Sequence, residues 1–490
     1  MAVKNQVGLI TYPDSLGGNL KSLHYVLENC FSGIFKGGVH ILPPFPSTGD
    51  RGFAPKTYLE IDPEFGTWDD IRAIGRDYDV LVDMMVNHIS RQSPYVQDYL
   101  EKGAESEYAD MFLTLDKLWD DGVPVQEDID KMFLRRPVPY SSYPVGDSGE
   151  RVLLWTTFGK SDPSEQVDLD IHSEQVRTLF REFLLNFKRH NVKIVRLDAV
   201  GYVIKKLGTS CFFVEPDIFG FLDWMLEQAA SLDMELLPEV HSHYSIQYKL
   251  AEHGCWIYDF ILPYQILSAL LDHDSRDLIH YLKTRPAKQF TMLDCHDGIP
   301  VKPDLDDLAA AEDARRVVKA CVDRGANLSL VLSEKHKGED GFDVHQIRCS
   351  YYSVLGCDDD AYLSARAIQF FAPGIPQVYY VGLLAGENDE AAVAATGEGR
   401  EINRHNYSME EIKESLQKPV VQRLMALIRF RNEYEAFQGG DFQVLASPNN
   451  GLRLAWTKGD FFCALEVDLP SGRSVISYRD ERGLLKEYTV

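Results

Sequence analysis

The most constraining feature of this 490-residue chain is a repeated order of short apolar runs and longer amphipathic stretches. Short runs rich in β-branched residues predict buried strands, and amphipathic stretches predict helices. This alternation is typical of a parallel sheet with helical crossovers, because parallel strands need long connections. Eight runs, the number of strands in a (β/α)8 TIM barrel, are present. They are residues 6–12, 38–45, 79–88, 192–201, 235–242, 255–262, 289–298 and 375–382.

Two connections between predicted strands are too long to be simple loops, and both are rich in glycine, proline and charge. Structureless loops of that length are improbable in a compact domain, so we expect two inserted subdomains. After a helical stretch at 422–437, short alternating segments predict a small antiparallel sheet. The predicted organisation is an α/β barrel of residues 1–88, 171–302 and 361–437, inserted subdomains at 89–170 and 303–360, and a C-terminal β domain at 438–490.

The charge and the cysteines restrict the partners and the compartment. A formal net charge of −25 argues against binding to nucleic acid or to an anionic membrane surface. No apolar run reaches the ~18 residues of a membrane span, and the N-terminus has no signal-peptide pattern. The 8 cysteines are scattered, without metal-site spacing. We therefore expect free thiols and a cytoplasmic protein, compatible with a monomer and with a homodimer.

Polar side chains gather at the ends of the predicted strands, where a parallel barrel places its catalytic groups. In an extended strand Arg196 and Asp198 point the same way, so the guanidinium can hold the carboxylate in its charged form. For any one residue, a structural ion pair is the competing interpretation. The polar residues at these strand ends are Asp83, Asn87, His88, Arg196, Asp198, Glu239, His241, His296 and Asp297.

Three carboxylates on three strands indicate cleavage of a glycosidic bond with retention of configuration. One carboxylate attacks the anomeric carbon, and another protonates the leaving oxygen and then deprotonates the acceptor. A third can stabilise the developing positive charge. Asp198, Glu239 and Asp297 fit these three tasks, although spacing alone does not rank them.

Four motifs resemble, in order and spacing, the four signature regions of the α-amylase family. They read DMMVNH, VRLDAVGY, PEVHS and DCHDG. Further segments are similar to the sucrose-phosphorylase group within that family. These segments are LITYPDSLGGNL, GVHILPPFPS, DRGFAP, GTSCF, FFAPGIPQVYYVGLLAG and REINRH.

The resemblance implies a nucleophile at Asp198, an acid/base at Glu239 and a transition-state stabiliser at Asp297. It also implies a donor glucose site without a catalytic metal or cofactor. The residues matching that site are Asp50, Phe53, His88, Arg196, His296 and Arg404, with Phe158 and Gln166 lining the same pocket. Core packing is the alternative for Phe53 and Phe158. His241 is either an acceptor-side residue or a structural histidine.

Two loops, 131–144 and 333–352, distinguish the acceptors within this group. This chain has Val344, His345 and Gln346 where typical sucrose phosphorylases have leucine, tyrosine and glutamine. It resembles the members that act on sucrose 6-phosphate, in which an arginine and this histidine hold the phosphate of fructose. Arg135 matches that arginine, and Arg136, Lys335 and Lys337 are weaker candidates.

The implied reaction converts sucrose 6-phosphate and inorganic phosphate to α-D-glucose 1-phosphate and D-fructose 6-phosphate. The expected partners are therefore small sugars and phosphate. Phosphorolysis of sucrose or of glucosylglycerol is the alternative within the group. Amylase-like chains also occur as non-catalytic transporter subunits, but those carry a membrane anchor and a damaged triad, which this sequence does not show.

Overall fold

The computed structural model divides into two compact units of described residues. The residues that the structure describes are 3–147, 149–302, 305, 308–331 and 342–490. The first unit is Ile41–Val240, and the second combines residues 3–40, His241–Val331 and residues 342–490.

Parallel strands carry the site residues of the first unit. Strand β8 pairs with β3 on one side and β9 on the other, and β2 ends where the unit begins. The register sets Asp83 beside Arg196 and Met85 beside Asp198. The strands within this unit are β3 (Val80–Met85), β8 (Val192–Asp198) and β9 (Glu235–Pro238), and β2 (Gly38–Ile41) reaches it only with its last residue.

Amphipathic helices accompany these strands. In α5 the buried positions recur at helical spacing, and Ser173 caps the first turn by accepting a hydrogen bond from the Gln175 amide. The helices of this unit are α2 (Trp68–Ile74), α3 (Pro94–Lys102), α4 (Gln126–Ile129), α5 (Glu174–Arg189) and α6 (Asp217–Ser231), with 3-10 turns η1 (Asp50–Gly52), η2 (Gly103–Glu105), η3 (Ala109–Met111), η4 (Leu115–Lys117) and η5 (Val200–Tyr202).

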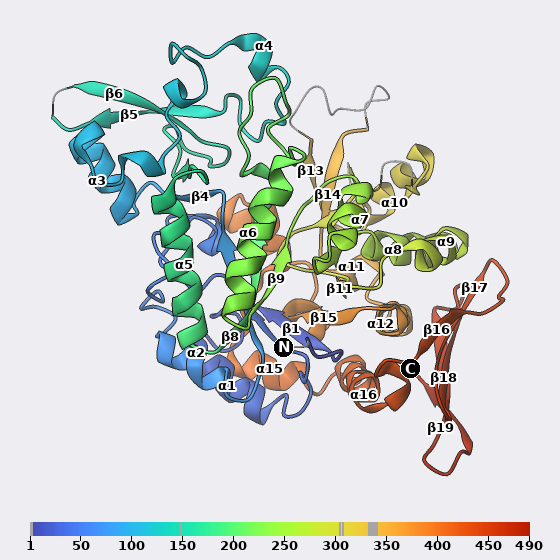
Figure 1. Ribbon diagram of the computed structural model, residues 1–490. Coiled ribbons are helices and arrows are strands. Elements are labelled where there is room, and N and C mark those ends of the chain that lie inside the picture. Colours follow the sequence, from blue (N-terminus) through green and yellow to red (C-terminus); the bar gives the residue numbers. More distant parts are fainter. Residues whose placement is uncertain (1–2, 148, 303–304, 306–307, 332–341) are drawn as a thin grey trace. The chain divides into compact units, whose positions relative to one another are not determined.

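The long segment after β3 forms two antiparallel pairs of strands. Strand β4 pairs with β7, which sets His88 opposite Asp168, and β5 pairs with β6 beside α3 (Figure 1). A separate apolar cluster that includes Trp119, Trp155 and Cys211 is buried in this region. The strands are β4 (His88–Ser90), β5 (Tyr140–Val145), β6 (Glu150–Trp155) and β7 (Gln166–Asp168).

The second unit contains a parallel sheet in the order β10-β11-β15-β1 and a smaller antiparallel sheet in the order β12-β14-β13. Its strands are β1 (Gly8–Thr11), β10 (Ile257–Asp259), β11 (Gln289–Thr291), β12 (Ile299–Pro300), β13 (Asn327–Leu330), β14 (Val344–Arg348) and β15 (Ile375–Tyr379). Its helices are α1 (Leu20–Asn29), α7 (Tyr244–Glu252), α8 (Leu262–Asp272), α9 (Arg276–Thr284), α10 (Ala311–Val322), α11 (Tyr351–Val354), α12 (Asp359–Phe371), α13 (Tyr380–Leu383), α14 (Glu390–Thr396), α15 (Met409–Ser415) and α16 (Pro419–Glu433), with the 3-10 turns η8 (Gly399–Asn403) and η9 (Glu435–Phe437).

The C-terminal residues form a five-stranded antiparallel sheet in the order β16-β17-β18-β19-β20, which lies beside α12 (Figure 1). The indole of Trp456 donates a hydrogen bond of 2.7 Å to the Phe371 carbonyl at the end of that helix. The strands are β16 (Asp441–Val444), β17 (Gly451–Lys458), β18 (Phe461–Asp468), β19 (Arg473–Arg479) and β20 (Leu485–Thr489).

Each of the eight apolar runs predicted as strands contains one parallel strand, and the predicted C-terminal antiparallel sheet is present. The fifth strand of that sheet, β20, was not predicted, because most of its side chains are exposed and it has no apolar alternation. Within the described part of the chain, no helix has both the length and the apolar character that a membrane crossing requires.

Candidate active site

Arg196 is the centre of a buried charge cluster in the first unit. Its guanidinium bonds the Asp83 carboxylate on β3 and donates a hydrogen bond of 2.7 Å to Asp198 at the end of its own strand. The other terminal nitrogen lies 3.6 Å from a Glu239 oxygen, just beyond β9. The Asp83 side chain is fully buried, whereas that of Asp198 is 18% exposed. Of these two carboxylates, Asp198 is therefore the one that is held by a cation and also open to a ligand.

A strained turn carries Asp50 and Phe53. Asp50 and Arg51 both have left-handed backbones, with φ of 47° and 49°. Gly52 follows at φ 106°, and a β-carbon there would lie 2.6 Å from the Pro43 carbonyl oxygen. Strain of this kind is found where a side chain must be aimed at a ligand. The turn places the buried Phe53 ring 5.9 Å from the Arg196 guanidinium.

His88 lies on β4, between the strained turn and the segment after β6. Its Nε2 lies 3.1 Å from the Phe53 carbonyl oxygen, which can only accept, so Nε2 carries the proton. Burial lowers the pKa of His88 below its usual value, against the opposing effects of Asp168, the Phe53 carbonyl and Asp50. The Phe158 ring packs 5.3 Å from the imidazole. Phe53, His88 and Phe158 are thus brought together in one place.

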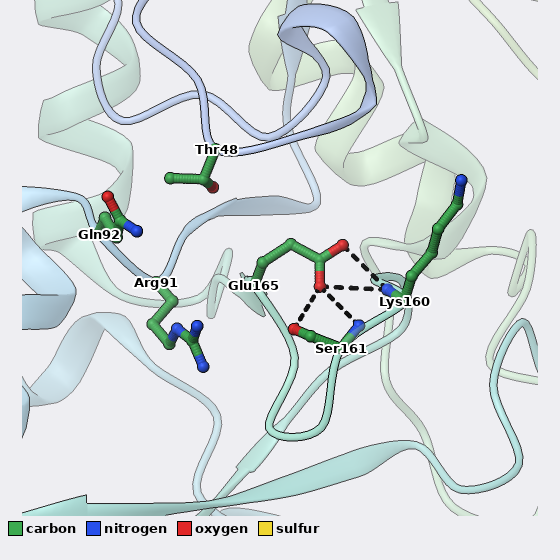
Figure 2. A pocket seen from close by; sticks show the side chains of 6 residues that line it. All are labelled: Thr48, Arg91, Gln92, Lys160, Ser161 and Glu165. Atoms are coloured by element: carbon green, nitrogen blue, oxygen red, sulfur yellow. Dashed lines mark hydrogen bonds between the residues drawn. The ribbon is translucent and has the colours of Figure 1, made fainter. Parts of the chain in front are cut away.

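Gln166 begins β7 and is buried, and among the described residues its side-chain oxygen has no hydrogen-bond partner. The loop before it is closed by Glu165, as Figure 2 shows. The Glu165 carboxylate accepts hydrogen bonds from the amides of Lys160 and Ser161 and from the Ser161 hydroxyl. Although burial opposes ionisation, these bonds lower the pKa of Glu165 to about 2. The loop borders a polar cavity of about 290 Å³ that is also lined by Thr48, Arg91 and Gln92.

The two arginines predicted for phosphate binding differ in their contacts. Arg136 donates to the carbonyls of Gly159 and Ser161, at 2.7 and 3.1 Å, and its other terminal nitrogen lies 3.3 Å from the Ser141 hydroxyl. Arg136 therefore holds the loop that carries Phe158. Toward the residues that the structure describes, Arg135 makes no ion pair or hydrogen bond, so its guanidinium is available to an anion.

Asp297 is surrounded by cations in the second unit. One carboxylate oxygen lies 3.2 Å from the Arg400 guanidinium, and the other lies 3.6 Å from Nε2 of His296. Burial favours the neutral acid, but Arg400, His296, His241 and Arg404 together hold the pKa of Asp297 well below its usual value. Asp297 is therefore an anion at neutral pH.

Arg404 and His241 are each fixed by neighbours in the same unit. Arg404 donates a hydrogen bond of 3.1 Å to the His296 carbonyl, and its guanidinium lies 5.7 Å from the Tyr12 ring centre. The imidazole of His241 stacks on Phe260 with the ring centres 4.0 Å apart.

His345 and Gln346 are consecutive residues of β14, and both are buried. Nδ1 of His345 is 2.7 Å from the Lys302 carbonyl oxygen, which can only accept, so Nδ1 is protonated and this contact orients the ring. The His345 and His241 rings lie 6.4 Å apart. Gly298 allows β14 to approach the segment after Asp297, since a β-carbon would lie 2.6 Å from the Ile347 carbonyl oxygen.

Sequence reasoning missed two cations in these clusters. Arg400 begins the same REINRH segment that carries Arg404, and its place in that segment is the signal that was available. Lys205 lies seven residues after Asp198, and its ammonium is buried against Asp168. The predicted candidates Lys335 and Lys337 lie outside the described residues.

The comparisons with known proteins agree with this fold. A family model for the α-amylase catalytic domain matches residues 17–244. The chain is 64% identical over 490 residues, all of both chains, to the sucrose 6(F)-phosphate phosphorylase of Thermoanaerobacterium thermosaccharolyticum. It is 46% identical to the sucrose phosphorylase of Streptococcus mutans, with 92% of each chain covered.

A solved structure agrees as well. The sucrose 6F-phosphate phosphorylase from Thermoanaerobacter thermosaccharolyticum superposes with a TM-score of 0.98 and 63% identity, covering 100% of this chain and 99% of that one. The chain belongs to the α-amylase family, within its sucrose-phosphorylase group. The predicted fold class, a (β/α)8 barrel with a C-terminal antiparallel sheet, is confirmed.

Proposed function

We propose that this protein is a phosphorylase that converts sucrose 6-phosphate and inorganic phosphate to α-D-glucose 1-phosphate and D-fructose 6-phosphate. The observation that carries this proposal is the 64% identity over the full length of both chains to a sucrose 6(F)-phosphate phosphorylase. The lower identity to a sucrose phosphorylase supports the same choice.

We assign the first chemical step to Asp198 and Glu239. The Asp198 carboxylate attacks the anomeric carbon while the bond from that carbon to the fructosyl oxygen breaks. Glu239 gives its proton to that oxygen, so fructose 6-phosphate departs with a neutral hydroxyl in place of an alkoxide, and a β-glucosyl ester remains on Asp198. The hydrogen bond from Arg196 orients the Asp198 carboxylate and favours its charged form before the attack.

In the second step inorganic phosphate takes the place of fructose 6-phosphate. A phosphate oxygen attacks the anomeric carbon and displaces Asp198, and Glu239 accepts the proton if the phosphate carries one. Two inversions give net retention, so the product is the α anomer. We assign Asp297 to stabilise positive charge on the glucosyl ring, a role suited to a carboxyl group that its surrounding cations keep ionised.

We assign the donor glucose site to Asp50, Phe53, His88, Phe158, Gln166, Arg196, His296 and Arg404. The buried, unsatisfied oxygen of Gln166 supports this assignment, because a buried acceptor without a partner is costly and a sugar hydroxyl would satisfy it.

We assign the phosphate group of fructose 6-phosphate to Arg135 and His345, with His241 and Gln346 on the same acceptor side. His345 is suited to this role because the Lys302 carbonyl holds its Nδ1, which fixes the orientation of an imidazole that can carry positive charge. Arg135 is suited because its charge is not used by a described neighbour. Both residues belong to the segments proposed as inserted subdomains, 89–170 and 303–360, of a barrel that ends before the β domain at 438–490.

Incubation with phosphate and each candidate donor tests the proposal, with glucose 1-phosphate and the released sugar measured together. Release of fructose 6-phosphate from sucrose 6-phosphate is expected. Preferential release of fructose or glycerol would instead identify a sucrose or glucosylglycerol phosphorylase. We also place the enzyme in the cytoplasm, since all eight cysteines are free and sugar phosphates are intracellular metabolites.

A further inference from the structure

Lys205 is a buried cation to which no step of the proposed mechanism assigns a role. Its side chain is 2% exposed, and its ammonium lies 2.8 Å from the fully buried Asp168 carboxylate. The same ammonium donates a hydrogen bond of 2.6 Å to the Asn87 side-chain oxygen and another to the Tyr202 carbonyl. Three oxygens from three separate segments therefore surround one charge.

The partners of Lys205 connect directly to His88. Asn87 precedes His88 in the chain, and its amide nitrogen donates a hydrogen bond of 3.0 Å to Asp168. Asp168 lies opposite His88 in the β4–β7 pair and also accepts hydrogen bonds from the backbone and hydroxyl of Thr157. The four side chains of Lys205, Asp168, Asn87 and His88 form one continuous group, which we name the Lys205 network.

The Lys205 network also contacts the aromatic side chains beside His88. The ammonium holds the carbonyl of Tyr202, whose ring packs edge-on against Phe158 at 4.9 Å. Phe158 in turn packs against the His88 imidazole. Movement of Lys205 would therefore disturb His88 from two sides.

We propose that Lys205 is a positioning residue of the donor glucose site, which compensates the Asp168 charge and thereby holds His88 in its neutral, Nε2-protonated form. The proposal rests on the assignment of His88 to the donor site. Protonation would place a second N–H, at Nδ1, toward the Asn87 amide group 3.5 Å away, which is itself a donor facing Asp168. Two donors cannot share that contact, so a cationic His88 would leave its present position.

The charges around His88 support this account. Burial lowers its pKa most strongly, Asp168 and Asp50 raise it, and Lys205 lowers it. Removal of the Lys205 charge leaves the Asp168 anion uncompensated and raises the pKa of His88. Removal of the Asp168 charge has the opposite effect, because the cation alone then faces the imidazole. The proposal thus predicts shifts of opposite sign for the two partners.

The test uses the full-length enzyme with α-D-glucosyl fluoride, a donor with a good leaving group, with fluoride release as the readout. Lys205→Met should lower kcat/KM by about tenfold to a hundredfold, the effect of a small displacement of a binding group. Lys206→Met is the matched control, because Lys206 is exposed and pairs only with Asp217 on α6 among the described residues. The control should stay within about twofold of wild type, as surface substitutions usually do.

A double-mutant cycle separates positioning from general stability. If Lys205 acts through His88, adding Lys205→Met to the His88→Ala variant should lower kcat/KM by less than about threefold. A full, multiplicative loss in that background would overturn the proposal. The His88 titration, followed by NMR of histidine-labelled enzyme and identified by its absence from His88→Ala, should move up in Lys205→Met and down in Asp168→Asn.

The charge-neutral double variant Lys205→Met/Asp168→Asn keeps the test decisive if the single variants fold poorly, because loss of both charges removes the uncompensated ion. Its His88 titration should return close to that of wild type. Unchanged titrations in all three variants would overturn the proposal. Because fluoride release does not depend on the natural acceptor, an enzyme that cleaves glucosyl fluoride but not sucrose 6-phosphate would contradict the proposed function and leave this inference intact.

Discussion

The two adjacent arginines, Arg135 and Arg136, give the most discriminating prediction about acceptor choice. Replacement of Arg135 by Ala should remove a charge-assisted hydrogen bond to the phosphate of fructose 6-phosphate, worth about 1.5–3 kcal/mol. That corresponds to about one to two decades in kcat/KM for sucrose 6-phosphate. Activity on unphosphorylated sucrose should fall much less. His345→Ala should behave in the same way, for the same reason.

Arg136→Ala is the matched control, because Arg136 donates hydrogen bonds to the carbonyls of Gly159 and Ser161. Its loss should loosen the loop that carries Phe158 and lower activity on both donors by a similar factor. The assay compares kcat/KM for sucrose 6-phosphate and sucrose, with glucosyl transfer to a neutral acceptor followed in parallel, since inorganic phosphate can use the same cations. Equal losses on both donors in Arg135→Ala and His345→Ala would refute the assignment.

Three further predictions concern the chemistry of the two steps. Asp198→Asn should abolish turnover, whereas Glu239→Gln should slow donors that need protonation far more than glucosyl fluoride; equal losses with both donors would exclude the acid/base role. The sugar phosphate formed should be the α anomer by NMR, and the β anomer would exclude double displacement. Arg400→Leu should raise the pKa of Asp297, so that activity declines on acidification at a higher pH than in wild type. Arg429→Leu, which removes an exposed arginine on α16, is the control, and the same acid decline in both variants would contradict the role of Arg400.

The parallel strands were predictable because each lies in a short, mostly buried apolar run, and such runs are visible in the sequence. The residues at which the strands end were not predicted. The run at 79–88 reads as one strand, yet β3 ends at Met85 and His88 pairs instead with Asp168, 80 residues later in the chain. Such long-range pairing leaves no local signal in the sequence.

The pairing of Arg196 with Asp198 was also predictable, because charge after an apolar run is unusual and the spacing of the two residues places them on one face of the strand. The contacts of Arg136 and Lys205 were not predictable. Arg136 resembles a phosphate-binding residue until its carbonyl partners, more than 20 residues away, are seen. Lys205 looks like its exposed neighbour Lys206 until its contact with Asp168 is known. The sequence shows where the charged residues are, but only the fold shows which of them already have a partner.

The most direct test of the central claim is a comparison of phosphorolysis rates for sucrose 6-phosphate and sucrose at equal concentrations with the purified wild-type enzyme. Glucose 1-phosphate is measured in both reactions, and the released sugar is identified. The account predicts a kcat/KM for sucrose 6-phosphate at least about tenfold above that for sucrose, from one or more phosphate contacts, with fructose 6-phosphate as the co-product. An equal or higher kcat/KM for sucrose, with release of fructose, would contradict it.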